Sequence, residues 1–178
     1  LALGAGLAAV GSPRLAGAAG LVVLANALAL VPLAGDPPPG PWRETLHVAQ
    51  LNVSHGNPQR RAVVRWLRRL EPRPHVVVLQ ETGAAWEAPL AGLRGAWPRA
   101  ASAYREDNFG MAVLTRLPQA RLGVHEDGPG GVPVVRLDAV APESGRPLTL
   151  FAVHPPPPLG GHLRRPRDAA LRHLARRL

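Results

Sequence analysis

Residues 75–81 read HVVVLQE, a short and almost continuous apolar run that ends in a glutamine and a glutamate. Such a run is typical of a strand that is buried on both faces of a sheet. The earlier stretch LHVAQLNV, residues 46–53, also has the pattern of a strand. Between the two, residues 57–71 place apolar side chains on one face of a predicted helix and arginines on the other. The apolar residues are Val63, Val64, Trp66, Leu67 and Leu70, and the arginines are Arg60, Arg61, Arg65, Arg68 and Arg69.

Four further apolar stretches follow residue 108 and are separated by turns that contain glycine or proline. This spacing is typical of short strands joined in hairpins. The stretches are 109–116, 120–126, 132–140 and 147–154. The final stretch, 165–178, predicts a helix with Asp168 near its start and arginines at its end, as the helix dipole favours. This order of strands and helices predicts an α/β domain with a mixed sheet.

The composition limits the function classes that the chain can serve. A chain of 178 residues is long enough for one domain with a sizeable core. There is no cysteine, which excludes a disulfide framework, a thiolate metal site and a cysteine nucleophile. The 21 basic residues are all arginine and the net charge is +9, which favours anionic partners such as phosphate esters, nucleic acid or acidic lipid headgroups.

The N-terminal part, residues 1–34, predicts membrane segments. Residues 15–34 carry no charge, and at about 1.5 Å per residue they can cross a hydrocarbon core of about 30 Å. A signal peptide and a buried helix of a soluble protein are the competing interpretations. The chain starts with a leucine inside an apolar stretch, so we expect its natural N-terminus to lie upstream. Arg14 before the span favours a cell-membrane protein whose domain is extracytoplasmic.

Residues 35–44 begin with GDPPPGPW, a composition that favours a semi-rigid linker over helix or central strand. The predicted domain therefore covers residues 45–178.

Three of the predicted strands end in a polar residue: Asn52, Glu81 and His154. Because strand ends in α/β sheets meet at one edge, where ligands usually bind, we expect these side chains to converge. Each residue also has a purely structural interpretation. Asn52 is equally typical of a turn, and Glu81 of a helix cap or a surface ion pair. His154 is equally typical of a half-exposed strand end, here followed by four prolines.

These stretches together resemble a known family. The succession LNV, VVVLQE, NFGMAVLTRLP and LTLFAVHPPPP is similar to the N-terminal half of the endonuclease/exonuclease/phosphatase superfamily, and the similarity covers roughly residues 45–178. Its members are metal-dependent phosphoesterases related to deoxyribonucleases, apurinic endonucleases, neutral sphingomyelinases and inositol phosphatases. The membrane prefix and proline-rich linker resemble a membrane-anchored bacterial branch. The resemblance implies half of a four-layer α/β/β/α sandwich.

The resemblance also implies a role for each strand-end residue. Glu81 matches the glutamate that binds Mg²⁺ or Mn²⁺, a cation that one or two carboxylates and a substrate phosphate can hold. Asn52 matches an asparagine that positions the phosphate, and His154 matches a phosphate-contacting histidine. Water then attacks phosphorus in line, with a further histidine and its aspartate as general base. The implied substrate is a phosphate ester, either nucleic acid or phospholipid-like.

The chain departs from the family pattern in several places. The family's Gly-Asp-x-Asn motif and its later Asp-His pair do not occur, and the only Gly-Asp is Gly35-Asp36. Ser54 stands where some relatives have an acidic residue. The resemblance therefore implies a truncated domain that is inactive alone. The alternative is a non-catalytic, membrane-tethered scaffold whose arginine-rich helix binds anionic ligands.

Overall fold

The structure is a computed structural model that describes residues 45–126, 131–157 and 160–176. The chain divides into two compact units, Leu1–Trp42 and Arg43–Leu178. The predicted membrane segments at 1–34 and the linker at 35–44 lie outside the described residues. Within the described ranges, no helix combines the length and apolarity that a membrane crossing requires.

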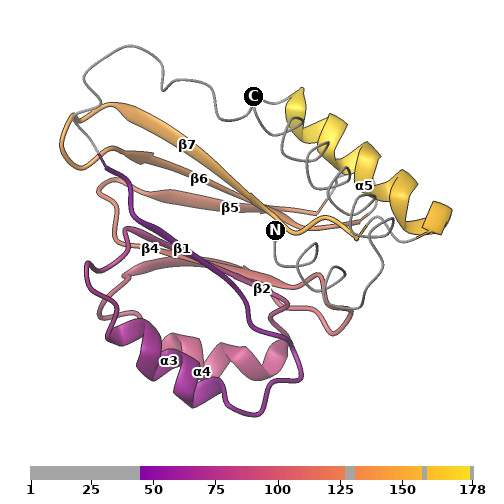
Figure 1. The fold of residues 1–178 in the computed structure, drawn as a ribbon. Helices are drawn as coiled ribbons and strands as arrows, with labels where there is room; N and C mark the ends of the chain where they lie inside the picture. The colour runs from indigo at the N-terminus through magenta and orange to yellow at the C-terminus, as the bar shows by residue number, and fades with distance from the viewer. Residues whose placement is uncertain (1–44, 127–130, 158–159, 177–178) are drawn as a thin grey trace, which may run out of the picture. The chain divides into compact units, whose positions relative to one another are not determined.

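The strands form two separate sheets (Figure 1). The first has the order β1-β2-β4-β3, with β1 parallel to β2 and the other pairs antiparallel. Its strands are β1 (Val48–Asn52), β2 (Val76–Gln80), β3 (Arg99–Ala103) and β4 (Met111–Thr115). The second is an antiparallel meander of β5 (Arg121–His125), β6 (Val134–Val140) and β7 (Pro147–Val153).

Helices lie outside the two stacked sheets (Figure 1). The helix α3 (Arg60–Arg68), the short 3₁₀ helix η2 (Ala84–Trp86) and the helix α4 (Glu87–Ala91) cover the first sheet. The helix α5 (Gly160–Ala175) lies on the far side of the second sheet. The predicted α/β class with a mixed sheet is confirmed, and the layers follow the order α/β/β/α.

Alternation along β2 explains why its sequence is apolar throughout. Val77 and Leu79 face the helices and join a core with Leu67, Trp86 and Trp97. The intervening residues face the second sheet and contribute to the core between the sheets. That core includes Val76, Val78, Met111, Val113, Val135 and Leu137. The prediction that residues 75–81 form a strand buried on both faces is therefore confirmed.

The structure corrects the sequence interpretation in several details. Trp66 does not pack in the core with Leu67 but is 46% exposed. The stretches around β4 and β5 are not paired in a hairpin, because residues 116–120 carry the chain from one sheet to the other. The last helix begins at Gly160, so Asp168 lies near its middle and not near its start. The sequence interpretation also missed η2, α4 and β3, whose residues are rich in alanine and have no clear period.

Candidate functional site

The structure brings Asn52, Glu81 and His154 together. The parallel register pairs Asn52 with Gln80, so the ends of β1 and β2 lie side by side. The Asn52 amide nitrogen donates to Glu81 Oε1 at 2.5 Å, and His154 Nε2 lies 3.5 Å from the same oxygen. The side chains of His154 and Glu81 are each 21% exposed, so solvent reaches a half-buried polar cluster.

Backbone geometry holds Glu81 in place. Glu81 directly follows β2 and has a φ of 60°, in the left-handed region that non-glycine residues rarely adopt. The next residue, Thr82, donates its N–H to the carbonyl of Gly110 at 3.1 Å. A Cβ on Gly110 would lie 2.0 Å from the Thr82 carbonyl oxygen, so only glycine permits this approach. A strained residue that its surroundings fix in this way is a common feature of functional sites.

Asn52 combines a turn role with a site role. Its side-chain oxygen accepts the Ser54 N–H at 3.1 Å, while its nitrogen donates to Glu81. The loop is further held by Trp86, whose indole N–H donates to the Ser54 carbonyl at 3.1 Å. The two hydrogen bonds of the Asn52 side chain, to Ser54 and to Glu81, fix the orientation of its amide. The structure is therefore compatible with both interpretations of Asn52, as a turn residue and as a site residue.

His154 reaches the site from the second sheet. It follows β7 directly, and the Gln80 side chain donates to the neighbouring Val153 carbonyl at 3.4 Å. The ring of Phe109 lies 6.1 Å from the imidazole, centroid to centroid, in a tilted arrangement. The two sheets are therefore linked at the cluster itself, and an aromatic side chain flanks the histidine.

The connection between β3 and β4 contributes residues that the sequence interpretation missed. Arg105 forms an ion pair with Asp107, whose carboxylate also accepts the Phe109 N–H at 3.2 Å. The hydrogen bond from Arg105 is the main reason that the pKa of Asp107 is lowered. The Glu106 carboxylate accepts the Ala84 N–H at 2.8 Å, which joins this loop to η2. The sequence signal that could have identified this loop is the run YREDN, residues 104–108, which is strongly polar and lies between two apolar stretches.

The donor set of the cluster suits one kind of metal site. A half-buried carboxylate is a ligand that a hard divalent cation such as Mg²⁺ accepts, and such a cation keeps several waters. Among the residues that the structure describes, no group of three or more histidine, aspartate or glutamate side chains is arranged to hold a metal. Glu81 therefore fits a weak site in which water and substrate phosphate supply most of the ligands.

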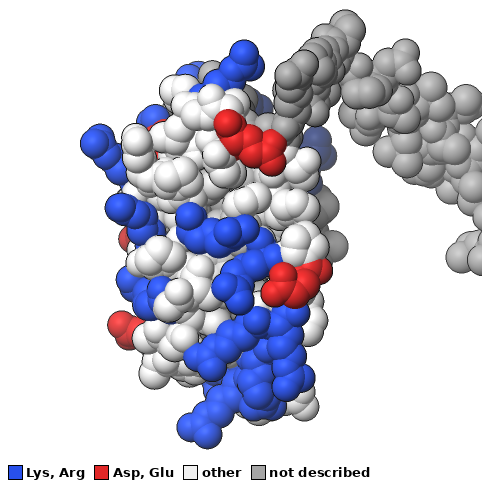
Figure 2. Space-filling view, turned by 90° about the vertical axis from the view of Figure 1, so that its left-hand side faces the viewer, with Lys and Arg blue, Asp and Glu red and all other residues white. Residues whose placement is uncertain are grey.

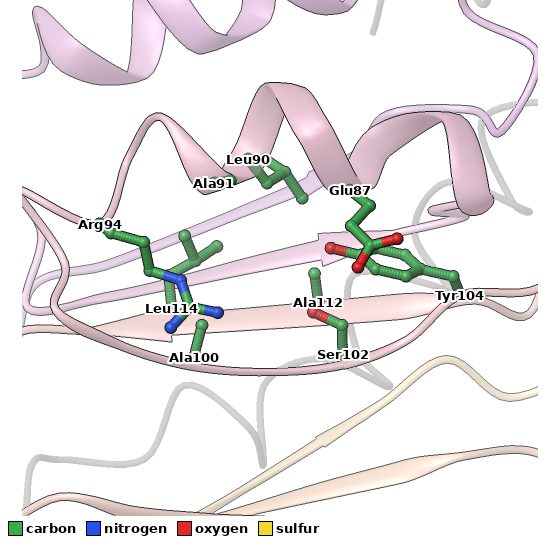
Figure 3. Close-up of a pocket in the computed structure, with 9 residues that line it drawn as sticks. All are labelled: Glu87, Leu90, Ala91, Arg94, Ala100, Ser102, Tyr104, Ala112 and Leu114. Atoms are coloured by element: carbon green, nitrogen blue, oxygen red, sulfur yellow. The ribbon is translucent and has the colours of Figure 1, made fainter.

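A separate cavity of about 400 Å³ lies between α4 and the strands β3 and β4 (Figure 3). Its apolar lining includes Leu90, Ala112 and Leu114. Glu87 and Tyr104 lie together toward one end of it, and Arg94 lies toward the other. The strand-end cluster does not line this cavity, so the two features are distinct.

Solved structures share the fold at low sequence identity. TDP2 from Caenorhabditis elegans matches with a TM-score of 0.55 at 16% identity, over 73% of this chain and 40% of that one. The human nocturnin catalytic domain with bound sulfate matches with a TM-score of 0.53 at 15% identity, over 74% and 58%. A functionally unknown conserved protein from Enterococcus faecalis matches with a TM-score of 0.51 at 14% identity, over 72% and 60%. The chain thus spans about half the length of these structures.

Sequence comparison identifies the family. A search of curated proteins found no match. In contrast, residues 49–178 match the model of the Endonuclease/Exonuclease/phosphatase family, which is most of the chain. Members of this family are hydrolases that act on phosphate esters, and the shared fold agrees with the match. The chain therefore belongs to the Endonuclease/Exonuclease/phosphatase family.

Proposed function

We propose that this chain is part of a membrane-anchored phosphoesterase that depends on Mg²⁺ or Mn²⁺. Its substrate is a phosphodiester or phosphomonoester, in nucleic acid or a phospholipid-like molecule, and water attacks the phosphorus in line. The observation that carries the proposal is that Asn52, at the end of a strand in the first sheet, and His154, after a strand in the second, both approach the Oε1 atom of Glu81. Family membership makes phosphate-ester hydrolysis the chemistry to expect there.

Glu81 is the residue that would hold the cation. Asn52 orients its carboxylate by donating to Oε1, and the left-handed backbone directs the side chain out of the β2 end. A divalent cation in this position supplies charge neutralisation for the phosphate and a more acidic bound water. The chain's own contribution is a fixed carboxylate that is open to solvent.

His154 would bind the phosphate. Its Nε2 faces Glu81 Oε1, so a proton on this nitrogen lies where a phosphate oxygen beside the carboxylate can accept it. Phe109 flanks the ring on one side. In the reaction, the water oxygen would bond to phosphorus and pass a proton to the further histidine that the family resemblance implies as general base, while the bond to the leaving oxygen breaks. His154 would stabilise the charge on the phosphate oxygens.

A metal-binding measurement tests the role of Glu81 on the full chain. Mn²⁺ binding, followed by electron paramagnetic resonance, should weaken by roughly tenfold or more in Glu81→Gln, because the amide loses the anionic ligand. Glu71→Gln is the matched control, since Glu71 is exposed and precedes the opposite end of β2. Equal Mn²⁺ binding by wild type and Glu81→Gln would contradict the assignment.

Activity should be measured on the longest protein that contains this sequence, because the chain spans about half the length of the similar structures. We expect residues 1–178 alone not to turn over bis(p-nitrophenyl) phosphate. In the longer protein, His154→Ala should lower the rate by about one to several orders of magnitude. A variant that lowered only the melting temperature would instead favour a structural role for His154.

The membrane anchor is proposed from residues 15–34, which are uncharged, and from Arg14, which favours an extracytoplasmic domain. Protease added to intact cells should therefore remove the domain. Protection in intact cells, with cleavage only after lysis, would reverse the proposed topology.

A further inference from the structure

A second charged feature lies at the opposite end of both sheets from the Asn52–Glu81–His154 cluster. The registers Val48↔Val76 and Arg99↔Thr115 place the starts of β1, β2 and β3 beside the end of β4. The connection 116–120 brings the start of β5 to the same place. Six exposed arginines gather here, and we call this group the arginine end: Arg69, Arg73, Arg94, Arg99, Arg116 and Arg121.

Backbone contacts hold the loops of the arginine end in place. The Arg116 side chain donates to the carbonyls of Pro74 at 3.2 Å and Arg73 at 2.9 Å. The Arg99 side chain donates to the Ala120 carbonyl at 3.0 Å. In the part of the chain that the structure describes, none of the six arginines forms an ion pair with a carboxylate. The guanidinium groups of Arg99 and Arg116 are therefore held in place. Arg121 lies opposite Asp138, whose pKa is lowered mainly by the hydrogen bond from Arg136 and also by the charge of Arg121.

Arginines outnumber the acidic residues at the arginine end. Glu81, Glu106, Asp107 and Glu126 lie at the end that carries the strand-end cluster. Glu71 and Glu143 lie in loops of the arginine end, and Asp138 lies opposite Arg121 in the register of β5 and β6. Figure 2 shows the side of the molecule that is on the left in Figure 1, where the starts of β1 and β7 lie; basic residues cover more of this surface than acidic ones, which form smaller separate patches. The net charge of this end therefore favours an anionic ligand.

We propose that the arginine end binds the phosphates of anionic lipid headgroups at a membrane surface, with the candidate site directed away from that surface. Guanidinium groups match phosphate oxygens in bidentate geometry, and anionic leaflets attract clustered basic residues. The described chain enters β1 through Thr45 at this same end, so the chain that leads from the proposed anchor connects to the domain here. The inference rests on the proposed membrane anchor and not on the proposed phosphoesterase activity.

The length of the strands argues against a role in holding the scissile phosphate. Five-residue strands such as β2 extend about 17 Å at roughly 3.3 Å per residue. A phosphate that contacts the arginine end is therefore not the phosphate that contacts Glu81. Nucleic acid binding at the arginine end is a different proposal, and the experiment below distinguishes it.

The absence of cysteine from the chain permits a site-specific test on the full chain. A fluorophore is attached at Gln119→Cys, an exposed position of the 116–120 connection, or at Gly56→Cys, in the loop after β1. A Cβ at Gly56 meets nothing within 4 Å. Vesicles contain a headgroup quencher in phosphatidylcholine alone or mixed with phosphatidylglycerol. We expect severalfold stronger quenching at Gln119 on the anionic vesicles, little at Gly56, and loss of the difference at high salt.

Charge variants identify the residues responsible. Arg69→Gln, Arg73→Gln and Arg121→Gln together should reduce quenching at Gln119 to the phosphatidylcholine level. The matched control, Arg61→Gln with Arg65→Gln and Arg165→Gln, removes the same charge from exposed helix positions and should leave quenching nearly unchanged. Both triple variants should bind Mn²⁺ as the wild type does, and Glu81→Gln should keep the vesicle response. The proposed lipid binding and the proposed metal site can therefore be contradicted independently of each other.

Two outcomes would overturn the lipid assignment. One is a Gln119 signal that does not depend on lipid charge, or that equals the Gly56 signal. The other is a Gln119 signal that responds to a single-stranded oligonucleotide without vesicles, is lost in the first triple variant, and does not respond to anionic vesicles. That result would assign the arginine end to nucleic acid.

Discussion

At the scale of single residues, the candidate site depends on the fixed conformation of Glu81. Its carboxylate oxygen receives the Asn52 amide and faces the His154 imidazole. Its backbone has a positive φ, and the contact between Thr82 and Gly110 stabilises this conformation. A functional side chain supported in this way loses little entropy on binding a ligand, because its position is set before the ligand arrives.

Substitution of Gly110 tests this support. In Gly110→Ala the new Cβ would lie 2.0 Å from the Thr82 carbonyl oxygen and 2.7 Å from the Arg105 nitrogen, so the backbone has to move. We expect a loss of about 1–3 kcal/mol in the free energy of unfolding, measured with urea, and weaker Mn²⁺ binding because Glu81 shifts. Gly95→Ala, whose Cβ meets nothing within 4 Å, is the control. Wild-type stability and Mn²⁺ affinity in Gly110→Ala would show that the contact is dispensable.

At the scale of elements, a polar network joins β6 to β7 on the outer face of the second sheet. Asp138 pairs with Arg136 and accepts the Thr149 hydroxyl from the adjacent strand at 2.7 Å. The Arg136 guanidinium also lies over the Phe151 ring, 5.8 Å from its centroid. The hydrogen bond from Arg136, followed by that from Thr149, lowers the pKa of Asp138 from its ordinary value.

This lowered pKa predicts an acid-dependent contribution to stability. A carboxyl group whose pKa is lower in the folded state stabilises the fold above its unfolded pKa of about 3.9, and the contribution disappears as the pH falls through the folded pKa. The free energy of unfolding of wild type should exceed that of Asp138→Asn by less than about 1 kcal/mol at neutral pH, because the pair is solvent-exposed. The difference should begin to shrink at about pH 4 and vanish once the pH lies below the folded pKa. Urea unfolding across this pH range measures it, and a difference independent of pH would contradict the assignment.

At the scale of the whole domain, the two sheets share one core. Val76 and Val113 from the first sheet pack with Val135 and Leu137 from the second, and all four are fully buried. The connection 116–120 adds Leu117 and Ala120 to the same core. Because neither sheet covers its inner face alone, we expect them to unfold as one unit.

Leu137→Ala tests this cooperativity. Removing a side chain with no exposed area should lower the free energy of unfolding by about 2–5 kcal/mol. Amide hydrogen exchange should accelerate in β2 and β4 as well as in β6, because the cavity opens onto both sheets. Val124→Ala on β5, where the side chain is 36% exposed, is the matched control and should have a small effect. Faster exchange confined to β5, β6 and β7 would show that the sheets unfold separately.

The sequence alone determined the elements whose pattern is local. Period-two and fully apolar runs identified β1, β2, β6 and β7, and helical spacing identified α3, because side-chain direction follows directly from backbone period. The sequence also predicted the convergence of Asn52, Glu81 and His154, since polar residues that follow strands in a sheet meet at its edge. Their chemical roles remain proposals.

Only the tertiary structure decided the features that depend on distant partners. The residues of α4 and β3 have weak local preferences, and they take their form because they cover and extend the sheet formed by β2 and β4. The sequence spacing between β4 and β5 is typical of a hairpin, so it does not reveal that the two strands belong to different sheets. The Gly110 contact and the arginine end join residues that are far apart in sequence. Local period fixes which way a side chain points, whereas its neighbours are fixed by how the sheets stack.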